Sequence, residues 1–386
     1  MKKVLAILLT VVMLCTVAVG CSQNQPASTP SAGASTGNPP SDTGSQQDNE
    51  NVTLIAVPTS GQNVVQTAVP LVAGEVMGIW KNLGLDVTRT HYVSGPPQLE
   101  ANPSGDWEIG WIGATACNTG ILQYDMVVLG LSGYDYSNMA FVRDNSDIYL
   151  AGDKGVPGTY GTAAEWKGKN IIVGVGTVCY ADLMLTLSAL GLTEDDVNII
   201  NMDISTGLQA FVAGEADVYF TSSSYASELA KRDGFKVIHT MKGMDAGMAG
   251  NLIANRSYLE KNEDVVVKYL EGALETIFWL GDEANKDQAA QWYVQVMKED
   301  FGTEMALEDA RTNIDQIGFR DISFYEELCK KGDDGLTGLQ REYKKFFEYH
   351  VQIGSADAAN LDKILAACDS TYLEKAIANY KSKHNK

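Results

Sequence analysis

Short β-branched runs alternate with longer stretches of helical spacing along most of the chain. Residues 51–57, 109–113, 171–175 and 197–200 are such runs, and glycines stand in or beside several of them. Runs of this length that are bounded by turn residues are typical of buried strands. Strands that alternate with helices predict a mainly parallel sheet, and the series occurs twice, which predicts two α/β lobes. From residue 263 onward the pattern is helical to the end.

The clearest unit is the strand–turn–helix–strand pattern of residues 167–200. Gly174 and Gly176 break the first apolar run, Thr177 is placed to cap a helix, and Gly191 is placed to end it. A glycine turn that opens a helix exposes backbone N–H groups and the positive end of the helix dipole. The unit is therefore a candidate site for a small anionic or polar group, and the alternative is an ordinary junction that holds nothing.

Other segments carry simpler expectations. Residues 58–62 (PTSGQ) are expected to form a turn after the first strand, and residues 64–83 a helix in spite of Pro70. A second glycine-led helix start is predicted at residues 114–118. The glycine-rich residues 152–162 are either a simple surface loop, which we favour, or a hairpin near the mouth of a cleft.

The N-terminus is typical of a secreted protein that is anchored to a membrane by lipid. Lys2 and Lys3 precede an apolar run that ends in Ala-Val-Gly-Cys, so residues 1–20 are predicted to be a lipoprotein signal peptide, with Cys21 as the lipidated first residue of the mature chain. The alternative is an ordinary secretory signal that is cut near Gly20. Acyl chains on Cys21 would hold the protein at the extracytoplasmic face of the cell membrane.

Composition separates a tether from a folded part. Residues 21–50 are rich in Ser, Gly, Pro, Gln, Asn and Thr, which predicts a disordered tether. The remaining 336 residues (386 − 50) exceed the usual size of a single core, which agrees with two lobes. The formal net charge of −20 argues against nucleic acid as a partner.

No motif for metal binding or catalysis stands out. Four cysteines lie beyond residue 50 without any CxxC pair, and the four histidines are scattered, so we expect no metal, no cofactor and no catalytic residue. Cys179 is expected to be a small buried residue and not a nucleophile. A disulfide between Cys329 and Cys368 remains open, because spacing alone cannot show it.

Several segments, in order, resemble one known family. They are AGEVMGIWKNLGLDVTRTHYVSG (73–95), PPQLEANPSGDWEIGWIGATACN (96–118), EWKGKNIIVGVGTVCYADLMLTLSALGLTEDDVNIINMD (165–203) and GLQAFVAGEADVYFTSSSY (207–225). Together they resemble the substrate-binding lipoproteins of ABC importers, in the taurine, aliphatic-sulfonate and nitrate group.

The resemblance implies a type 2 periplasmic-binding-protein fold, with two α/β lobes joined by a two-strand hinge and a helical C-terminal region. Lobe one would be residues 51–140 plus 246–386, and lobe two residues 141–245. The implied partners are a small-molecule ligand and an ABC permease with its ATPase, and the implied state is a monomer without enzymatic activity. Pyrimidine-synthase relatives of the family carry a cysteine-rich, histidine-containing segment that this sequence lacks. A surface sensor lipoprotein, or uptake of a pyrimidine- or flavin-type vitamin precursor, is the alternative function.

The candidate ligand site follows from the rule that ligands sit beyond the carboxyl ends of strands in α/β sheets. The segments there offer hydroxyls, amides and backbone N–H groups but no Lys, Arg or His. This favours a monoanion such as a sulfonate, a zwitterion or a polar neutral molecule. Each residue also has an ordinary structural role as its alternative, such as helix capping for Thr177 and a solvated loop for Asp245. The candidates are Thr59, Ser60, Gln62, Gly113, Ala114, Thr115, Thr177, Val178, Cys179, Tyr180, Ser222, Ser223, Asp245 and Asn251.

Overall fold

A computed structural model describes residues 53–244, 246–352 and 356–384. The predicted signal peptide, the tether and Cys21 lie outside these residues, as does Asp245. No helix in the described part of the chain is both long and apolar enough to cross a membrane.

The first sheet, within the described residues, has six strands in the order β11-β4-β10-β3-β1-β2. β1 pairs in parallel with β2 and β3, whereas β10 lies antiparallel between β3 and β4. The strands are β1 (Ile55–Gln62), β2 (Leu85–Tyr92), β3 (Ile109–Gly113), β4 (Met126–Asp135), β10 (Met248–Asn255) and β11 (Ile317–Gly318).

The second sheet, counted over the same described ranges, has five strands in the order β7-β6-β8-β5-β9. β6 runs parallel to β7 and β8, and β5 runs antiparallel to β8 and β9. The strands are β5 (Met139–Arg143), β6 (Asn170–Val173), β7 (Asn198–Asn201), β8 (Val218–Thr221) and β9 (Phe235–Thr240). The two sheets confirm the predicted α/β class, but the prediction of mainly parallel pairing was wrong. Of the strand pairs in the described residues, four are parallel and five are antiparallel. The strands that follow or precede a chain crossing, β5 and β10, pair antiparallel to their neighbours.

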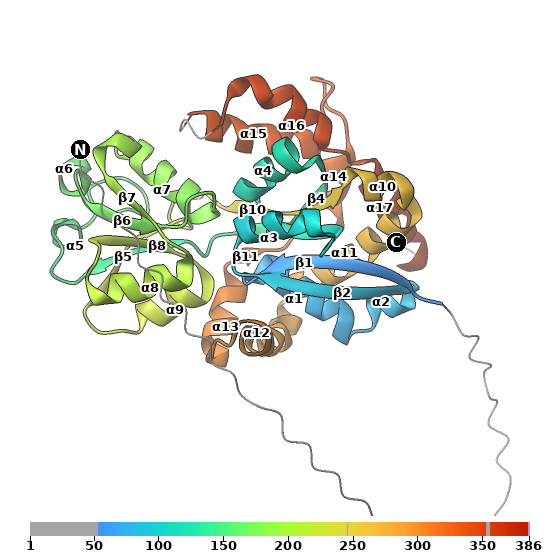
Figure 1. Cartoon of the computed structure of the whole chain (residues 1–386), viewed down its shortest axis with the longest axis horizontal. Coiled ribbons are helices and arrows are strands. Elements are labelled where there is room, and N and C mark those ends of the chain that lie inside the picture. Colours follow the sequence, from blue (N-terminus) through green and yellow to red (C-terminus); the bar gives the residue numbers. More distant parts are fainter. Residues whose placement is uncertain (1–52, 245, 353–355, 385–386) are drawn as a thin grey trace, which may run out of the picture. The chain divides into compact units, whose positions relative to one another are not determined.

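Helices cover both faces of the second sheet. α7 packs on one face and α8 with α9 on the other, as Figure 1 shows. Its helices are α5 (Asp147–Ala151), α6 (Ala163–Trp166), α7 (Val178–Ala189), α8 (Ile204–Ala213) and α9 (Ser223–Ala230). Apolar side chains on both faces of its strands explain why the segments are continuous β-branched runs and do not alternate with polar residues.

The first sheet carries the remaining helices, among them the predicted helical C-terminal region. They are α1 (Val65–Val76), α2 (Ile79–Asn82), α3 (Gly95–Ala101), α4 (Ala114–Tyr124), α10 (Arg256–Lys261), α11 (Glu263–Gly281), α12 (Lys286–Phe301), α13 (Leu307–Asp315), α14 (Ile322–Cys329), α15 (Gly338–Gln352), α16 (Leu361–Ala367) and α17 (Thr371–His384). The largest apolar core of the chain lies between these helices and the first sheet.

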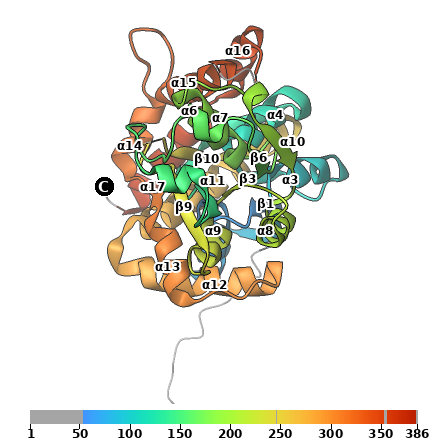
Figure 2. The same cartoon turned by 90° about the vertical axis from the view of Figure 1, so that its left-hand side faces the viewer.

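The chain passes twice between the sheets. It leaves the first sheet after β4 and enters the second at β5, and it returns from β9 to β10. Figure 2 gives a second view of the strands and helices around these crossings.

Two local predictions were wrong. Residues 58–62 continue strand β1, because parallel pairing with β2 extends to the register of Gln62 with Tyr92. Pro58 is tolerated there because the ladder between β1 and β3 begins only at Thr59, so the missing N–H of Pro58 falls before that ladder. The predicted helix at 64–83 is two helices, α1 and α2. Gly78 separates them, because its φ of 70° is not helical.

The glycine-rich residues 152–162 are a small hairpin and not the simple loop that we favoured. An antiparallel bridge joins Asp153 to Tyr160, and a second joins Thr159 to His239 on β9. The segment is therefore fixed to the second sheet. Among the described cysteines, Cys329 and Cys368 are both free thiols, which answers the open question of a disulfide.

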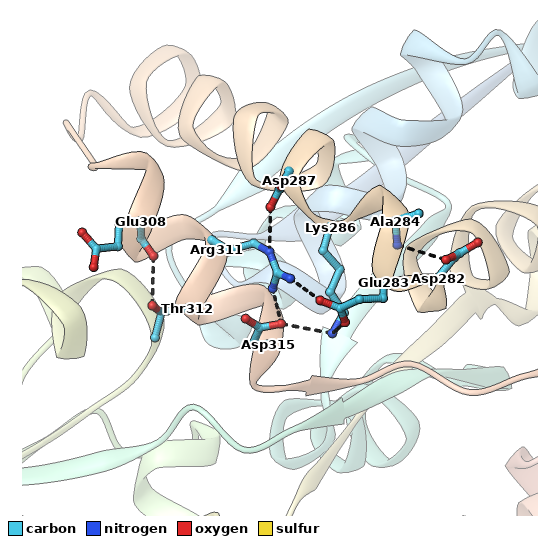
Figure 3. Close-up of polar contacts among 9 residues, drawn as sticks. All are labelled: Asp282, Glu283, Ala284, Lys286, Asp287, Glu308, Arg311, Thr312 and Asp315. Atoms are coloured by element: carbon cyan, nitrogen blue, oxygen red, sulfur yellow. Dashed lines mark hydrogen bonds and ion pairs between the residues drawn. The ribbon is translucent and has the colours of Figure 1, made fainter.

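A network of charges fixes α13 against α12, as Figure 3 shows. The Arg311 guanidinium bonds Asp287 at 2.9 Å and also contacts Glu283 and Asp315, and Lys286 Nζ lies 3.0 Å from Asp315. The carboxylates of the network are largely exposed, so each pair contributes little to stability, and the network is one of several contacts between α12 and α13. Helix α13 in turn contacts α9 of the second sheet.

Candidate functional site

Residues from both sheets line one cavity of about 450 Å³, which we call cavity one. It lies beyond the carboxyl ends of several strands, where α/β folds usually bind ligands. The first sheet and its helices contribute Gln62, Asn63, Val64, residues 93–97, Gly113 and Ala116. The second sheet and its helices contribute Gly174, Val175, Thr177, Val178, Cys179, residues 201–204, Phe220 and Ser222.

Helix starts converge on cavity one. The residues that precede α1, α3, α4, α7, α8 and α9 all line it, namely Val64, Ser94, Gly113, Thr177, Asp203 and Ser222. Four of them, Val64, Ser94, Gly113 and Ser222, make no side-chain hydrogen bond to their helices. Each helix start carries roughly half a positive charge, so the cavity presents N–H donors and a positive potential without a cationic side chain.

The predicted helix start at Thr177 is confirmed. Its hydroxyl accepts from the Tyr180 amide at 3.4 Å and donates to the Gly174 carbonyl at 2.6 Å. Gly176 adopts a φ of 80°, a conformation that favours glycine, and so turns the chain from β6 into α7. Gly113 lets the opposite side approach closely, because a Cβ on it would lie 3.3 Å from Val178 Cγ1.

The side chains of cavity one carry little charge. None of the described residues that line it is Lys, Arg or His, and Asp203 supplies a carboxylate. That carboxylate is already engaged by Ser205, through the amide at 2.9 Å and the hydroxyl at 2.8 Å. A ligand would therefore be held by backbone and side-chain hydrogen bonds, which suits a monoanion or a polar neutral group.

Buried amides fix the orientation of Gln62. Its Nε2 donates to Gln98 Oε1 at 2.9 Å, and Gln98 Nε2 donates to Ser60 Oγ at 2.7 Å. Gln98 is fully buried, so this chain is rigid. The arrangement leaves Gln62 Oε1 beside Gly113 as an oriented acceptor.

Cys179 and Ser222 are buried residues of the cavity wall. Burial raises the pKa of the Cys179 thiol to about 12, so it is not a nucleophile near neutral pH. One helical turn further along α7, Asp182 Oδ1 lies 3.0 Å from His239 Nε2, and both side chains are fully buried. Thr159 of the hairpin bonds the other ring nitrogen at 2.8 Å.

Six of the predicted site residues line cavity one, and six do not. Those that line it are Gln62, Gly113, Thr177, Val178, Cys179 and Ser222. Thr59, Ser60, Ala114, Thr115, Tyr180 and Asn251 do not. Asp245 and the side chain of Ser223 lie outside what the structure describes.

The residues outside cavity one have structural partners or other surroundings. Thr59 Oγ1 donates to the Ile109 carbonyl and bonds the Tyr269 hydroxyl, both at 2.8 Å, because β1 continues through this position. The Tyr180 hydroxyl donates to Glu194 at 2.8 Å. Ala114 and Asn251 line a separate cavity, described below.

Sequence reasoning missed two segments of cavity one, residues 93–97 and 201–204. Both follow predicted strands, so the strand-end rule that found Thr177 applies to them as well. The Ser-Gly-Pro-Pro turn after β2 was the available signal for the first. For the second the signal was Asp203, which is followed by a helical pattern and caps α8.

Comparisons with known proteins identify relatives and similar folds. The model of the family described as NMT1/THI5 like matches residues 160–280. A putative ABC transporter periplasmic binding protein of Brachyspira hyodysenteriae is 27% identical over 219 residues, which are 55% of this chain and 62% of that protein. The match therefore spans less than two thirds of the relative's length.

Solved structures share the fold at low sequence identity. The nitrate-binding protein NrtA of Synechocystis superposes with a TM-score of 0.64 at 12% identity, covering 86% of this chain and 90% of that one. The alkanesulfonate-binding protein SsuA of Xanthomonas axonopodis, bound to MOPS, gives 0.62 at 14% identity, covering 82% and 98%. These findings confirm the periplasmic-binding-protein fold and the resemblance stated from the sequence: the chain is similar to the SsuA/NMT1-like substrate-binding proteins.

Proposed function

We propose that the protein is an extracytoplasmic solute-binding protein that captures a small organic solute in cavity one and delivers it to the permease of an ABC importer. The observation that carries the proposal is the convergence of six helix starts from both sheets on one cavity of about 450 Å³. Similarity to a putative ABC transporter binding protein supports the class.

The proposed mechanism is closure of a two-lobed clamp. In this proposal lobe one is residues 51–140 plus 246–386 and lobe two is residues 141–245, as expected from the sequence, except that β5 begins at Met139 and so moves residues 139–140 to lobe two. The two chain crossings act as the hinge. A solute that contacts helix starts on both lobes binds the closed state more tightly and shifts the population towards it. The closed monomer, held at the membrane by lipid on Cys21, is what the permease recognises, and no catalysis is involved.

A monoanionic or polar organic solute, with sulfonate-like compounds favoured, fits the chemistry of the walls. The deep wall offers Gln62, Ser222 and the helix starts, and the mouth offers the half-exposed apolar residues Val93 and Val175. A bare inorganic anion would leave the apolar residues unused. The same observation supports the second candidate, uptake of a pyrimidine- or flavin-type vitamin precursor. A sensor lipoprotein would use the same clamp without a permease.

Thermal-shift screening tests the proposal. The panel contains taurine, alkane sulfonates, nitrate, bicarbonate and pyrimidine or flavin precursors. A solute at 100 times its Kd stabilises the folded state by about 2.7 kcal/mol, which raises Tm by several degrees. Thr177→Trp should abolish the shift by filling cavity one.

The matched control is Thr162→Trp, because Thr162 also caps a helix of the second sheet but lies outside cavity one. The control variant should keep the full shift. An equal shift in both variants would show that the solute does not bind in cavity one.

A further inference from the structure

A second cavity of about 250 Å³ lies beneath α15, and we call it cavity two. Its walls come from β4 and β10 of the first sheet, from α15 and, through Leu185, from α7. Figures 1 and 2 both show α15 near α7, and the Tyr349 hydroxyl bonds the Ala181 carbonyl of that helix at 2.6 Å. The volume exceeds the roughly 150 Å³ of an engineered cavity that holds benzene, so a two-ring molecule fits it.

Aromatic rings make up much of the wall of cavity two, and their polar groups are already engaged. The Tyr134 hydroxyl donates to Glu342 at 2.8 Å, the Tyr343 hydroxyl to Cys117 Sγ at 2.7 Å, and the Tyr349 hydroxyl to the Ala181 carbonyl at 2.6 Å. These tyrosines therefore offer ring faces to a ligand and no free donor. Flat apolar molecules are the natural match for such walls.

Asn251 supplies one oriented acceptor. Its side chain is fully buried, and its Nδ2 donates to the Ala249 carbonyl at 3.2 Å and the Ile112 carbonyl at 3.4 Å. The two carbonyls fix the amide, because a flip would set oxygen against oxygen. Asn251 Oδ1 is buried and has no hydrogen-bond partner among the described residues. A buried acceptor of this kind favours a ligand that donates a hydrogen bond.

The charged residues of cavity two are paired with each other. Lys345 Nζ lies 2.9 Å from Glu342 Oε1, and the other oxygen of that carboxylate accepts from Tyr134. The Glu342 carboxylate is thus shared between Lys345 and Tyr134, and the Lys345 side chain is 73% exposed, so its charge is met by solvent. The chemistry that remains is that of a neutral, flat molecule with one N–H or O–H group.

We propose that cavity two is a second ligand site, which takes a neutral one- or two-ring aromatic molecule whose N–H or O–H group donates to Asn251 Oδ1. The site touches both sides of the clamp, because Leu185 belongs to α7 and Tyr349 ties α15 to Ala181 of the same helix. If the proposed function holds, such a ligand binds the closed arrangement better than the open one. It then raises the affinity of cavity one for the solute, and the solute raises the affinity of cavity two for the ligand by the same factor.

Indole is the probe, and benzofuran is its isostere without the N–H group. Ligand-observed NMR titration of the full chain should give saturable indole binding at one site. The affinity for indole should exceed that for benzofuran by about 2- to 10-fold, the effect of one net hydrogen bond. Asn251→Ala should reduce that ratio to about 1 while both compounds still bind.

Leu185→Trp, which fills cavity two, should abolish indole binding, and Ser188→Trp on the exposed side of α7 should leave it intact. Thr177→Trp should also leave it intact, so cavity two is tested apart from the proposed function. If Leu185→Trp does not fold, the Asn251→Ala ratio decides alone. The proposal is overturned if indole fails to bind at millimolar concentration, binds equally in folded Leu185→Trp, or keeps its preference over benzofuran in Asn251→Ala.

Discussion

Cavity one and cavity two share a helix but differ in what that helix presents. Val178 and Cys179, at the start of α7, line cavity one, whereas Leu185, two turns later, lines cavity two. A helix offers backbone donors only at its first turn and side chains alone along its flank. The position of a cavity along a helix therefore decides whether backbone N–H donors can reach a ligand, and the side chains decide the rest.

The largest expected effect is a fall in unfolding free energy when the helix shared by both cavities loses a buried contact. Asp182 lies on α7 between the two walls, and Asp182→Ala would remove the carboxylate that the buried His239 imidazole contacts. Leaving the buried imidazole nitrogen without its hydrogen-bond partner costs about 1–3 kcal/mol of unfolding free energy. Urea denaturation measures it, with the exposed Asp195→Ala as the control. A loss below about 1 kcal/mol would mean that the pair does not hold α7.

A pH titration of stability tests the α15 side of cavity two. Burial lowers the pKa of His350, on α15 beside cavity two, to about 4. The unfolded chain takes up a proton near pH 6.5 and the folded chain does not, so stability falls as the pH drops from about 6.5 to about 4. At pH 5 the loss from this group is about 2 kcal/mol.

The measurement is the difference in unfolding free energy between the wild type and His350→Leu across that pH range. Subtracting the unfolding free energy of the variant from that of the wild type removes the contributions of other titrating groups. The difference should slope between pH 6.5 and pH 4 and be flat above pH 7. A difference that does not change with pH would show that His350 titrates normally in the folded chain.

The smallest effect concerns the mouth of cavity one. Val175 is 41% exposed and lines the cavity, so Val175→Ser should weaken an organic solute with an apolar tail by about 1 kcal/mol, roughly fivefold in Kd. Isothermal titration of sulfonates of increasing chain length measures the effect, with Val76→Ser, which is exposed outside cavity one, as the control. If Val175→Ser weakens the binding of short and long sulfonates equally, the apolar tail of the solute does not contact Val175.

Local signals in the sequence were enough for the α7 start. Gly174, Gly176, Thr177 and Gly191 act on neighbours a few residues away, so their roles could be predicted from spacing alone. The turn predicted at residues 58–62 was wrong because a contact that is distant in the sequence decides the structure there. Pairing of β1 with β2, which is distant in the chain, overrides the turn chemistry of Pro58 and Gly61 and buries Thr59 and Ser60.

The composition of cavity one needed the fold. Residues 93–97 and 201–204 face one another only because β2 and β7 end towards the same cavity, and no spacing in the sequence carries that information. Cavity two was missed altogether, because its walls combine β4, β10, α7 and α15, which are far apart in sequence. Asn251 was predicted as a ligand-binding residue of the main site, but it lines cavity two.

The placement of β10 has a consequence for how the chain acquires its structure. β3 and β4 follow each other in sequence but are held apart by β10, which pairs with both. During synthesis these two strands emerge well before residues 248–255, and the whole second sheet is made in between. Until β10 arrives, each has an open edge that can pair with another molecule. The first sheet is therefore completed late, and we expect the newborn chain to depend on chaperones through that interval.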